Sequence, residues 1–226
     1  MTTDVFTARV QGTPRDALPV SRQPSPVTVR RLGLTDYLPA WRAMQEFTAQ
    51  RSAQTGDEIW LTEHRPVYTL GVAARPEHLP RGDNRIEVIR TDRGGQITYH
   101  GPGQLVAYLL LDLKRRGVTV RQMVRSIEQA VIDLLAERSV DAGRRAGAPG
   151  VYVGAAKIAA LGLRVRGGGC YHGVALNVDM DLAPFAAIDP CGYPGLAVTQ
   201  LRDLGVAAAL PELGERLAHH LLRQLA

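Results

Sequence analysis

Two short segments of the sequence place a reactive side chain among glycine, proline and alanine. The first surrounds Cys191 in Ile188-Asp189-Pro190-Cys191-Gly192-Tyr193-Pro194-Gly195. Proline and glycine on both sides predict a tight loop, the setting of a nucleophile whose thiolate needs a cationic neighbour. The loop alone leaves a structural role for Cys191 open. Cys170 heads a strand-like run instead, and we interpret it as a structural cysteine.

The second segment surrounds Lys157 in Gly154-Ala155-Ala156-Lys157-Ile158-Ala159-Ala160-Leu161-Gly162. Only Lys157 and Lys114 are lysines among the 27 Lys and Arg residues. In an internal strand such an ammonium group is partly desolvated, which favours the neutral amine and suits it to proton transfer. At a sheet edge it would simply extend its charge into solvent. The residues alone leave both alternatives open.

A glycine-rich segment, Arg93 to Gln104, reads Arg93-Gly94-Gly95-Gln96-Ile97-Thr98-Tyr99-His100-Gly101-Pro102-Gly103-Gln104. Its glycines allow the backbone to approach a ligand closely. It lacks the Gly-Lys-Ser/Thr of a P-loop, and it precedes a strand rather than joining a strand to a helix as a dinucleotide fingerprint does. We expect a ligand-binding loop, with a long hairpin turn as the alternative. His172 is a weaker candidate, because it can simply hydrogen-bond a neighbouring backbone group.

The elements that must position these segments follow from hydrophobic periodicity. We expect a mobile N-terminal extension over 1–26 and one catalytic domain over 27–226. Helices are predicted from Thr35, as N-cap, to about Gln50, from Thr119 onward, and over about 211–224. Strands are predicted at 27–29, 58–62, 66–70, 86–90, 105–113, 151–153, 157–165 and 171–178. Strands in consecutive runs favour an α+β fold, a mixed sheet with helices packed on one side.

Composition excludes several classes of protein. The chain has 226 residues, 45% hydrophobic and 22% charged, which is an ordinary globular balance. No window approaches 18 apolar residues and no secretory signal is visible, so we expect a cytoplasmic protein without a membrane span. Two cysteines and scattered histidines predict neither a disulfide scaffold nor a metal site. The net charge of +5 is concentrated near the N-terminus, which weakens the case for nucleic acid, and such a mild basic surplus could steer an acidic protein partner just as well.

Four blocks together resemble the lipoyl(octanoyl) transferases of lipoate biosynthesis, over about residues 30–205. They are the segment from Arg93, the Ala-Lys-Ile-Ala-Ala-Leu-Gly run at Lys157, His172-Gly-Val-Ala-Leu-Asn, and Pro190-Cys191-Gly. The resemblance implies transfer of an octanoyl group from octanoyl-acyl carrier protein to a lysine of lipoyl domains, in 2-oxoacid dehydrogenases and the glycine cleavage H protein. It implies no cofactor, and a bent mixed sheet with helices like the catalytic domain of biotin and lipoate protein ligases.

The resemblance also implies roles for individual residues. Cys191 looks like the nucleophile that becomes the acyl thioester, and Lys157 like the partner that favours its thiolate and later takes a proton from the acceptor lysine. Backbone N–H groups around Cys191 and on the Lys157 strand are expected oxyanion donors. The residues implied to line the acyl pocket are Arg93, Gly94, Gly95, Gln96, Ile97, Thr98, Tyr99, His100, Ala160, Leu161, Gly162, His172, Gly173, Val174 and Ala175. Arg166-Gly167-Gly168-Gly169 departs from the family, in which many relatives carry further basic residues.

Two other functions compete with this expectation. An ATP-dependent lipoate or biotin ligase on the same fold adenylates a free acid and needs no cysteine nucleophile, so Cys191 argues against it. A non-catalytic module that docks carrier or lipoyl domains would need neither Cys191 nor Lys157.

Overall fold

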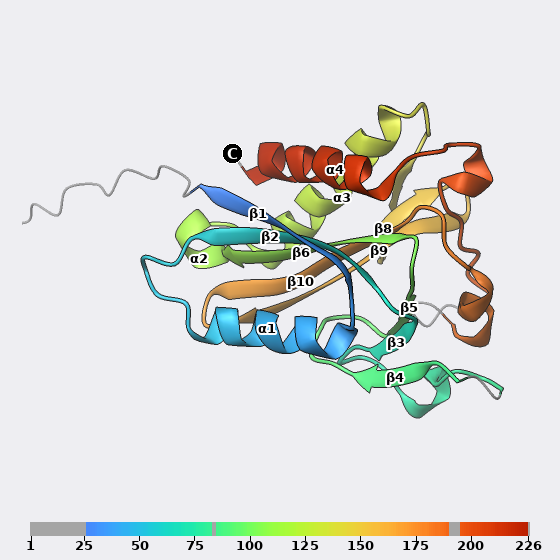
Figure 1. Cartoon of the computed structure of the whole chain (residues 1–226), viewed down its shortest axis with the longest axis horizontal. Helices are drawn as coiled ribbons and strands as arrows, with labels where there is room; N and C mark the ends of the chain where they lie inside the picture. Colours follow the sequence, from blue (N-terminus) through green and yellow to red (C-terminus); the bar gives the residue numbers. More distant parts are fainter. Residues whose placement is uncertain (1–25, 83–84, 190–194, 226) are drawn as a thin grey trace, which may run out of the picture.

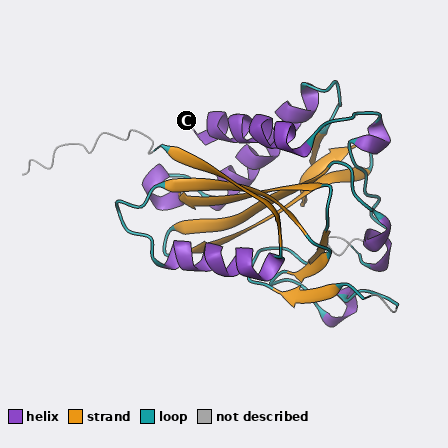
Figure 2. Cartoon of the chain, viewed as in Figure 1, coloured by secondary structure: helices purple, strands orange, loops and turns teal. Residues whose placement is uncertain are grey.

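The computed structural model describes residues 26–82, 85–189 and 195–225, which form two β-sheets with helices around the larger one (Figures 1 and 2). The larger sheet is mixed, because β1 runs parallel to β2 while the other neighbouring strands are antiparallel. Its strands, in spatial order, are β1 (Val27–Thr35), β2 (Asp57–His64), β6 (Gln104–Asp112), β10 (Gly169–Asn177), β9 (Ala156–Arg166), β8 (Ala148–Val153) and β7 (Gly143–Arg145). This arrangement confirms the predicted α+β class.

The two strands in the middle of the sheet, β6 and β10, are buried almost from end to end. Their sequences are continuous apolar runs rather than alternating ones, which is typical of strands covered on both faces. Leu105, Ala107 and Leu109 point into one apolar cluster, while Val106 and Tyr108 point into another. Both faces of the sheet therefore need a cover.

Helices supply that cover on both faces, so the expected one-sided packing is wrong. α3 (Val120–Ala136) and α4 (Leu210–Leu225) lie on one face and α1 (Tyr37–Ala49) on the other, as Figure 1 shows. Met44 of α1 packs with Val106 and Tyr108, whereas Ile127 of α3 packs with the opposite face. The order of elements along the chain does not say on which face each helix lies.

The sequence predicted the N-cap residues of two helices. Thr119 caps α3, where its hydroxyl accepts a bond from the amide of Gln122 and the Gln122 side chain accepts one from the amide of Thr119, so this prediction is confirmed. The N-cap of α1 is Asp36 and not Thr35. Thr35 ends β1, and its hydroxyl lies 2.9 Å from the hydroxyl of Thr62 on β2.

Part of the glycine-rich segment is a strand, which corrects the expectation of a loop or a plain turn. β5 (Ile97–His100) pairs with β3 (Val67–Leu70), which pairs in turn with β4 (Glu87–Arg90) to form the smaller sheet. Ile97 and Tyr99 pack with Tyr68 and Leu70 in a cluster of their own. The alternation of apolar and polar residues over 97–100 is the sequence signal of this strand. Short elements that the sequence did not predict are α2 (Leu113–Arg116), η1 (Pro76–His78), η2 (Ala183–Ala187), η4 (Arg202–Leu204) and β7.

Candidate active site

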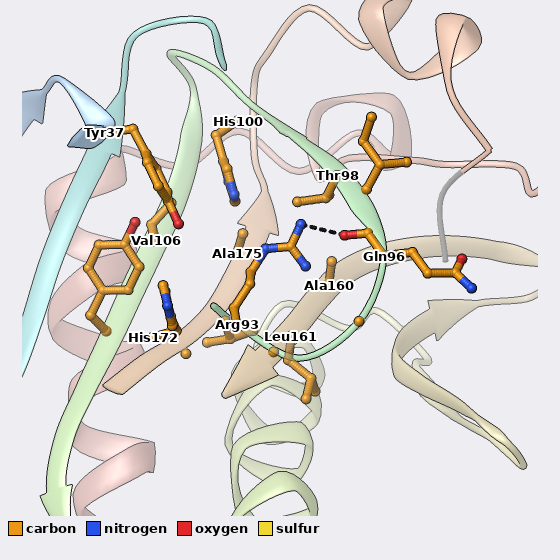
Figure 3. Close-up of a pocket in the computed structure, with 16 residues that line it drawn as sticks. Tyr37, Arg93, Gln96, Thr98, His100, Val106, Ala160, Leu161, His172 and Ala175 are labelled. Atoms are coloured by element: carbon orange, nitrogen blue, oxygen red, sulfur yellow. Dashed lines mark hydrogen bonds between the residues drawn. The ribbon is translucent and has the colours of Figure 1, made fainter. Parts of the chain in front are cut away.

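A pocket lies where the smaller sheet meets β6, β9 and β10, with about 530 Å³ of empty space including its opening to solvent (Figure 3). One helix, two sheets and the loop before β5 contribute to its wall. The lining residues are Tyr37, Arg93, Gly95, Gln96, Ile97, Thr98, His100, Val106, Tyr108, Ala160, Leu161, Gly162, His172, Gly173, Val174 and Ala175.

Small residues on β9 and β10 form the wall at the centre of the pocket. Ala160 pairs with Ala175, and Gly162 pairs with Gly173 in the antiparallel register. A Cβ on Gly173 would lie 1.9 Å from the carbonyl oxygen of Ala107, so only glycine lets β6 and β10 approach here. A Cβ on Gly162 would lie 2.7 Å from the carbonyl oxygen of Gly94, which has the same consequence for the loop before β5. The wall therefore leaves room for a slender apolar ligand.

Arg93 holds the loop before β5 against the smaller sheet. Its Nη2 donates to the carbonyl oxygens of Thr69, at 2.6 Å, and Gln96, at 2.7 Å, the second of which is the dashed line in Figure 3. Its Nη1 donates to the carbonyl of Gly94 at 3.0 Å. Gly95 adopts φ +84°, a conformation that suits glycine, so that the loop can turn around the guanidinium. We infer that Arg93 shapes the pocket through its backbone partners.

Buried histidines and tyrosines gather at the end of the pocket nearest α1. The ring of Tyr37 stacks on His100, and the Nε2 of His64 lies 2.5 Å from the hydroxyl of Tyr108. Burial lowers the pKa of His100 to about 3 and that of His64 to about 4. Both imidazoles are therefore neutral near pH 7.

His172 belongs to the same end of the pocket and is paired with a carboxylate. Its Nε2 lies 2.9 Å from Oδ1 of Asp92, and its backbone adopts φ +63°. This corrects the simpler interpretation of His172, in which the ring bonds a neighbouring backbone group. In the chain, Asp92 follows β4 and directly precedes Arg93. It lies 80 residues before His172, so only the tertiary fold brings the two side chains together.

Lys157 is buried in an internal strand, with 3% of the residue exposed. Its ammonium donates to the carbonyl of Pro149 at 3.1 Å and lies 5.2 Å from the ring centre of Tyr152. These contacts exclude the alternative of a solvent-directed lysine at a sheet edge. Its backbone amide donates to the carbonyl of Ala197, so this particular N–H is not available as an oxyanion donor.

The structure collects thirteen of the fifteen residues expected to line an acyl pocket, and the two others, Gly94 and Tyr99, do not line it. Gly94 uses its amide to bond the carbonyl of Leu163, and Tyr99 points into the apolar cluster of the smaller sheet. Cys191 lies outside the described residues, and its role stays a prediction. Cys170 is fully buried, and burial raises the pKa of its thiol to about 12, which fits a structural cysteine.

Three pocket residues were missed by sequence reasoning, namely Tyr37, Val106 and Tyr108. Each lies in an element whose apolar pattern was recognised, so each was interpreted as ordinary core. Within the described ranges no three His, Cys, Asp or Glu side chains are placed to hold a metal ion. None of the helices that the structure describes has both the length and the apolar character needed to cross a membrane.

The comparisons with known proteins cover nearly all of the folded chain. Residues 36–222 match the family model "Lipoyl protein ligase A/B catalytic domain". An octanoyltransferase of Azoarcus sp. is 64% identical over 200 residues, 88% of each protein. An octanoyltransferase of Dechloromonas aromatica is 62% identical over 88% of this chain and 97% of its own length.

Solved structures show the same fold at much lower identity. A bipartite lipoate protein ligase of Thermoplasma acidophilum superposes with a TM-score of 0.67 at 18% identity, covering 88% of this chain and 84% of its own. A biotin protein ligase of Aquifex aeolicus gives a TM-score of 0.54 at 13% identity, covering 88% and 69%. The family match and the high-identity relatives place the chain in the lipoyl protein ligase A/B catalytic domain family, among the octanoyltransferases.

Proposed function

We propose that this protein is the octanoyltransferase of lipoate biosynthesis, which moves an octanoyl group from acyl carrier protein to a lysine of a lipoyl domain through a thioester on Cys191. The octanoyltransferase names of relatives at 57–64% identity support the reaction class. The structural observation that carries the proposal is the small-residue pocket that begins at Ala160, three residues beyond buried Lys157 on β9. The same proposal includes a location in the cytoplasm. It also includes a division of the chain into an N-terminal extension over 1–26 and a single catalytic domain over 27–226.

The first half of the reaction loads the enzyme. The thiolate of Cys191 attacks the carbonyl carbon of the donor thioester, a new C–S bond forms, and the bond to the phosphopantetheine sulfur breaks. The departing thiolate takes up the proton of the Lys157 ammonium, which becomes a neutral amine. One thioester replaces another, so no activation by ATP is needed. An ordinary thiol is only a few per cent ionised at pH 7, and a nearby ammonium group favours the thiolate. Lys157 is the cation that we assign to this task.

The second half transfers the chain to the acceptor. The amine of the lipoyl-domain lysine attacks the acyl-enzyme, a C–N bond forms, the bond to Cys191 breaks, and the amine loses a proton. We assign the acceptance of that proton to Lys157 in its neutral form. Pairing of its backbone with Ala197 and Thr199 brings Lys157 against the segment that follows Cys191 in the chain, which supports these assignments.

The pocket supplies binding energy for the acyl chain. Ala160, Gly162, Gly173 and Ala175 offer little side-chain bulk, so methylene groups can lie against β9 and β10. Each buried methylene contributes about 0.8 kcal/mol, and an eight-carbon chain about 5 kcal/mol at most. That is enough for the protein to bind an octanoyl group in preference to a much shorter one.

Intact-protein mass spectrometry after mixing with octanoyl-acyl carrier protein tests the proposal. We expect one octanoyl adduct on the wild type and on Cys170→Ser, and none on Cys191→Ala. If the adduct persists in Cys191→Ala, or disappears only in Cys170→Ser, the assignment of the thioester to Cys191 is wrong.

A second arm supplies free octanoate with ATP and a lipoyl-domain acceptor. We expect no transfer, because a thioester donor is required. Robust transfer in this arm would make the protein an ATP-dependent ligase, and binding of the carrier protein without any acyl adduct would make it a docking module.

A further inference from the structure

The end of the pocket nearest α1 contains a buried nitrogen that no described residue bonds. His172 is 2% exposed and lines the pocket, and its Nε2 faces Asp92. Its Nδ1 is buried and has no hydrogen-bond partner within 26–82, 85–189 and 195–225. Figure 3 shows the His172 ring beside Tyr37, on the opposite side of the pocket from Gln96 and Thr98. A buried polar atom of this kind needs a partner from a ligand or solvent.

The surroundings of Asp92 decide which hydrogen-bonding role Nδ1 has. Asp92 accepts bonds from Trp41 Nε1 at 3.0 Å, from Gln45 Nε2 at 3.2 Å and from the Tyr171 hydroxyl. Although partial burial opposes it, these bonds and the one from His172 hold the pKa of Asp92 well below its usual range. The carboxylate is ionised and accepts the proton of Nε2, while burial lowers the pKa of His172. The ring is therefore neutral, and Nδ1 carries an unshared lone pair on a residue that lines the pocket.

The strand register locates His172 relative to the Lys157 ammonium. His172 pairs with Leu163, one position beyond the Gly162 and Gly173 pair that ends the small-residue wall. The ammonium bonds Pro149 on β8, two positions before Val151, the partner of Ala159, so it lies near Ala160, where the pocket begins. Leu163 lies three positions after Ala160, which is about 10 Å along the strand. An extended eight-carbon acyl chain spans about 9 Å and a twelve-carbon chain about 14 Å. A chain that starts beside the Lys157 ammonium thus approaches His172 only when it is longer than octanoyl.

Resting on the acyl transfer proposed above, we propose that His172 is a specificity-determining residue: it accepts a hydrogen bond from a hydroxyl at the far end of an acyl chain and disfavours an unsubstituted chain long enough to reach it. A terminal methyl group against Nδ1 would leave a buried acceptor without a donor, and such groups are costly. A terminal hydroxyl of nearly the same size supplies the donor. The octanoyl chain ends before this point and avoids the cost.

Pairs of acyl-carrier-protein thioesters that differ only in the terminal group test this assignment. The pairs are 8-hydroxyoctanoyl with nonanoyl, 10-hydroxydecanoyl with undecanoyl, and 12-hydroxydodecanoyl with tridecanoyl. We expect the wild type to load the hydroxylated member about fivefold faster at ten or twelve carbons, the effect of one hydrogen bond of ordinary strength. Faster loading of the unsubstituted member at all three lengths would overturn the proposal.

Two variants separate the nitrogen from the rest of the cluster. His172→Phe keeps a ring but removes Nδ1, and the ratio within each pair should fall to one or below. Tyr171→Phe removes another hydrogen bond to Asp92 from a residue that does not line the pocket, and the wild-type ratio should persist. A ratio that changes equally in both variants would assign the effect to packing of the cluster and overturn the role of His172. Because each ratio compares two substrates of one protein, a general loss of activity does not change it.

Octanoyl loading of the wild type separates failure of this inference from failure of the proposed function. If octanoyl is loaded and the hydroxyl preference is absent, only the assignment of His172 fails. If octanoyl is not loaded, the proposed function fails, and calorimetric binding of 10-hydroxydecanoic and undecanoic acids to the wild type tests His172 on its own. Tighter binding of undecanoic acid would then overturn the assignment, as would His172→Phe if it left a preference for the hydroxy acid unchanged.

Discussion

The backbone amide of Lys157 donates a 2.8 Å hydrogen bond to the carbonyl of Ala197. The amide of Thr199 donates in turn to the carbonyl of Lys157 at 3.0 Å, so the segment after Cys191 lies parallel to β9 at this point. The Lys157 ammonium bonds the carbonyl of Pro149 on β8. The segment after Cys191 therefore holds the backbone of Lys157, and β8 holds its side chain. The position of the ammonium group depends on both contacts.

Gly150 makes room for this lysine and gives the first prediction. A Cβ at position 150 would lie 2.8 Å from the carbonyl oxygen of Ala159 and 3.0 Å from Cε of Lys157, and φ there is +140°. We expect Gly150→Ala to displace the ammonium group and to slow octanoyl loading about tenfold or more, since small misplacements of catalytic groups are costly. Quenched time courses, analysed by intact-protein mass spectrometry, measure the rate of octanoyl loading.

Gly147→Ala is the matched control for Gly150→Ala. Gly147 also has a positive φ, +75°, but nothing lies within 4 Å of a Cβ built there. It therefore carries the backbone strain without the collision. Equal loss of loading in both variants would show that strain, and not the position of Lys157, limits the reaction.

The small-residue wall predicts which acyl chains fit. Ala160→Leu adds three carbons to the wall opposite Ala175. We expect octanoyl loading to fall about tenfold relative to hexanoyl loading, because about two methylene groups, near 1.6 kcal/mol, lose their place. Ala155→Leu, at an exposed site between β8 and β9, should keep the wild-type ratio. An unchanged ratio in Ala160→Leu would place the chain elsewhere.

Burial of Cys170 predicts an inert thiol. The residue is 0% exposed, and burial raises its pKa to about 12, so almost no thiolate forms at pH 8. In Cys191→Ala, Cys170 is the sole cysteine of the chain. We expect iodoacetamide to leave this variant unmodified in buffer and to add one carbamidomethyl group in urea. Rapid modification of the folded variant would contradict the structural role of Cys170.

Much of the candidate site could be predicted from the sequence, because many of its residues lie close together in the chain. Lys157, Ala160 and Gly162 share one strand, and the spacing of small residues along it is visible without a structure. Thr119 likewise caps α3 through Gln122, three residues away. The positions of such residues could therefore be predicted from the sequence, whereas the role of Lys157 stays a proposal.

Long-range pairing could not be predicted in the same way. Asp92 and His172 are 80 residues apart and meet only because the smaller sheet folds over β10. Tyr37 has the spacing of an ordinary core residue on α1, and only the tertiary fold turns it toward His100. The face on which α1 packs was missed for the same reason, since periodicity identifies an apolar face but not its partner.

The neutral histidines at this end of the pocket predict a loss of stability in mild acid. Folding lowers the pKa of His100 from 6.5 to about 3 and that of His64 from 6.5 to about 4. Between about pH 4 and 6.5 the unfolded chain binds these protons and the folded chain does not, so acid favours unfolding. The stabilisation is complete above pH 6.5 and is lost as the pH falls toward 4. Two such groups change the free energy of unfolding by up to about 2.7 kcal/mol per pH unit.

Urea unfolding at pH 7.5, 6.5 and 5.5 measures this dependence. We expect the free energy of unfolding to fall most steeply in the lower interval, and His100→Gln to reduce the slope by up to about 1.4 kcal/mol per pH unit, since it removes one of the buried neutral histidines. His219→Gln replaces an exposed ring on α4 and leaves the buried cluster intact, so the slope should stay as in the wild type. A free energy of unfolding that is constant from pH 7.5 to 5.5 would mean that His64 and His100 take up protons in the folded protein, and the pocket would then carry positive charge where the structure has neutral rings.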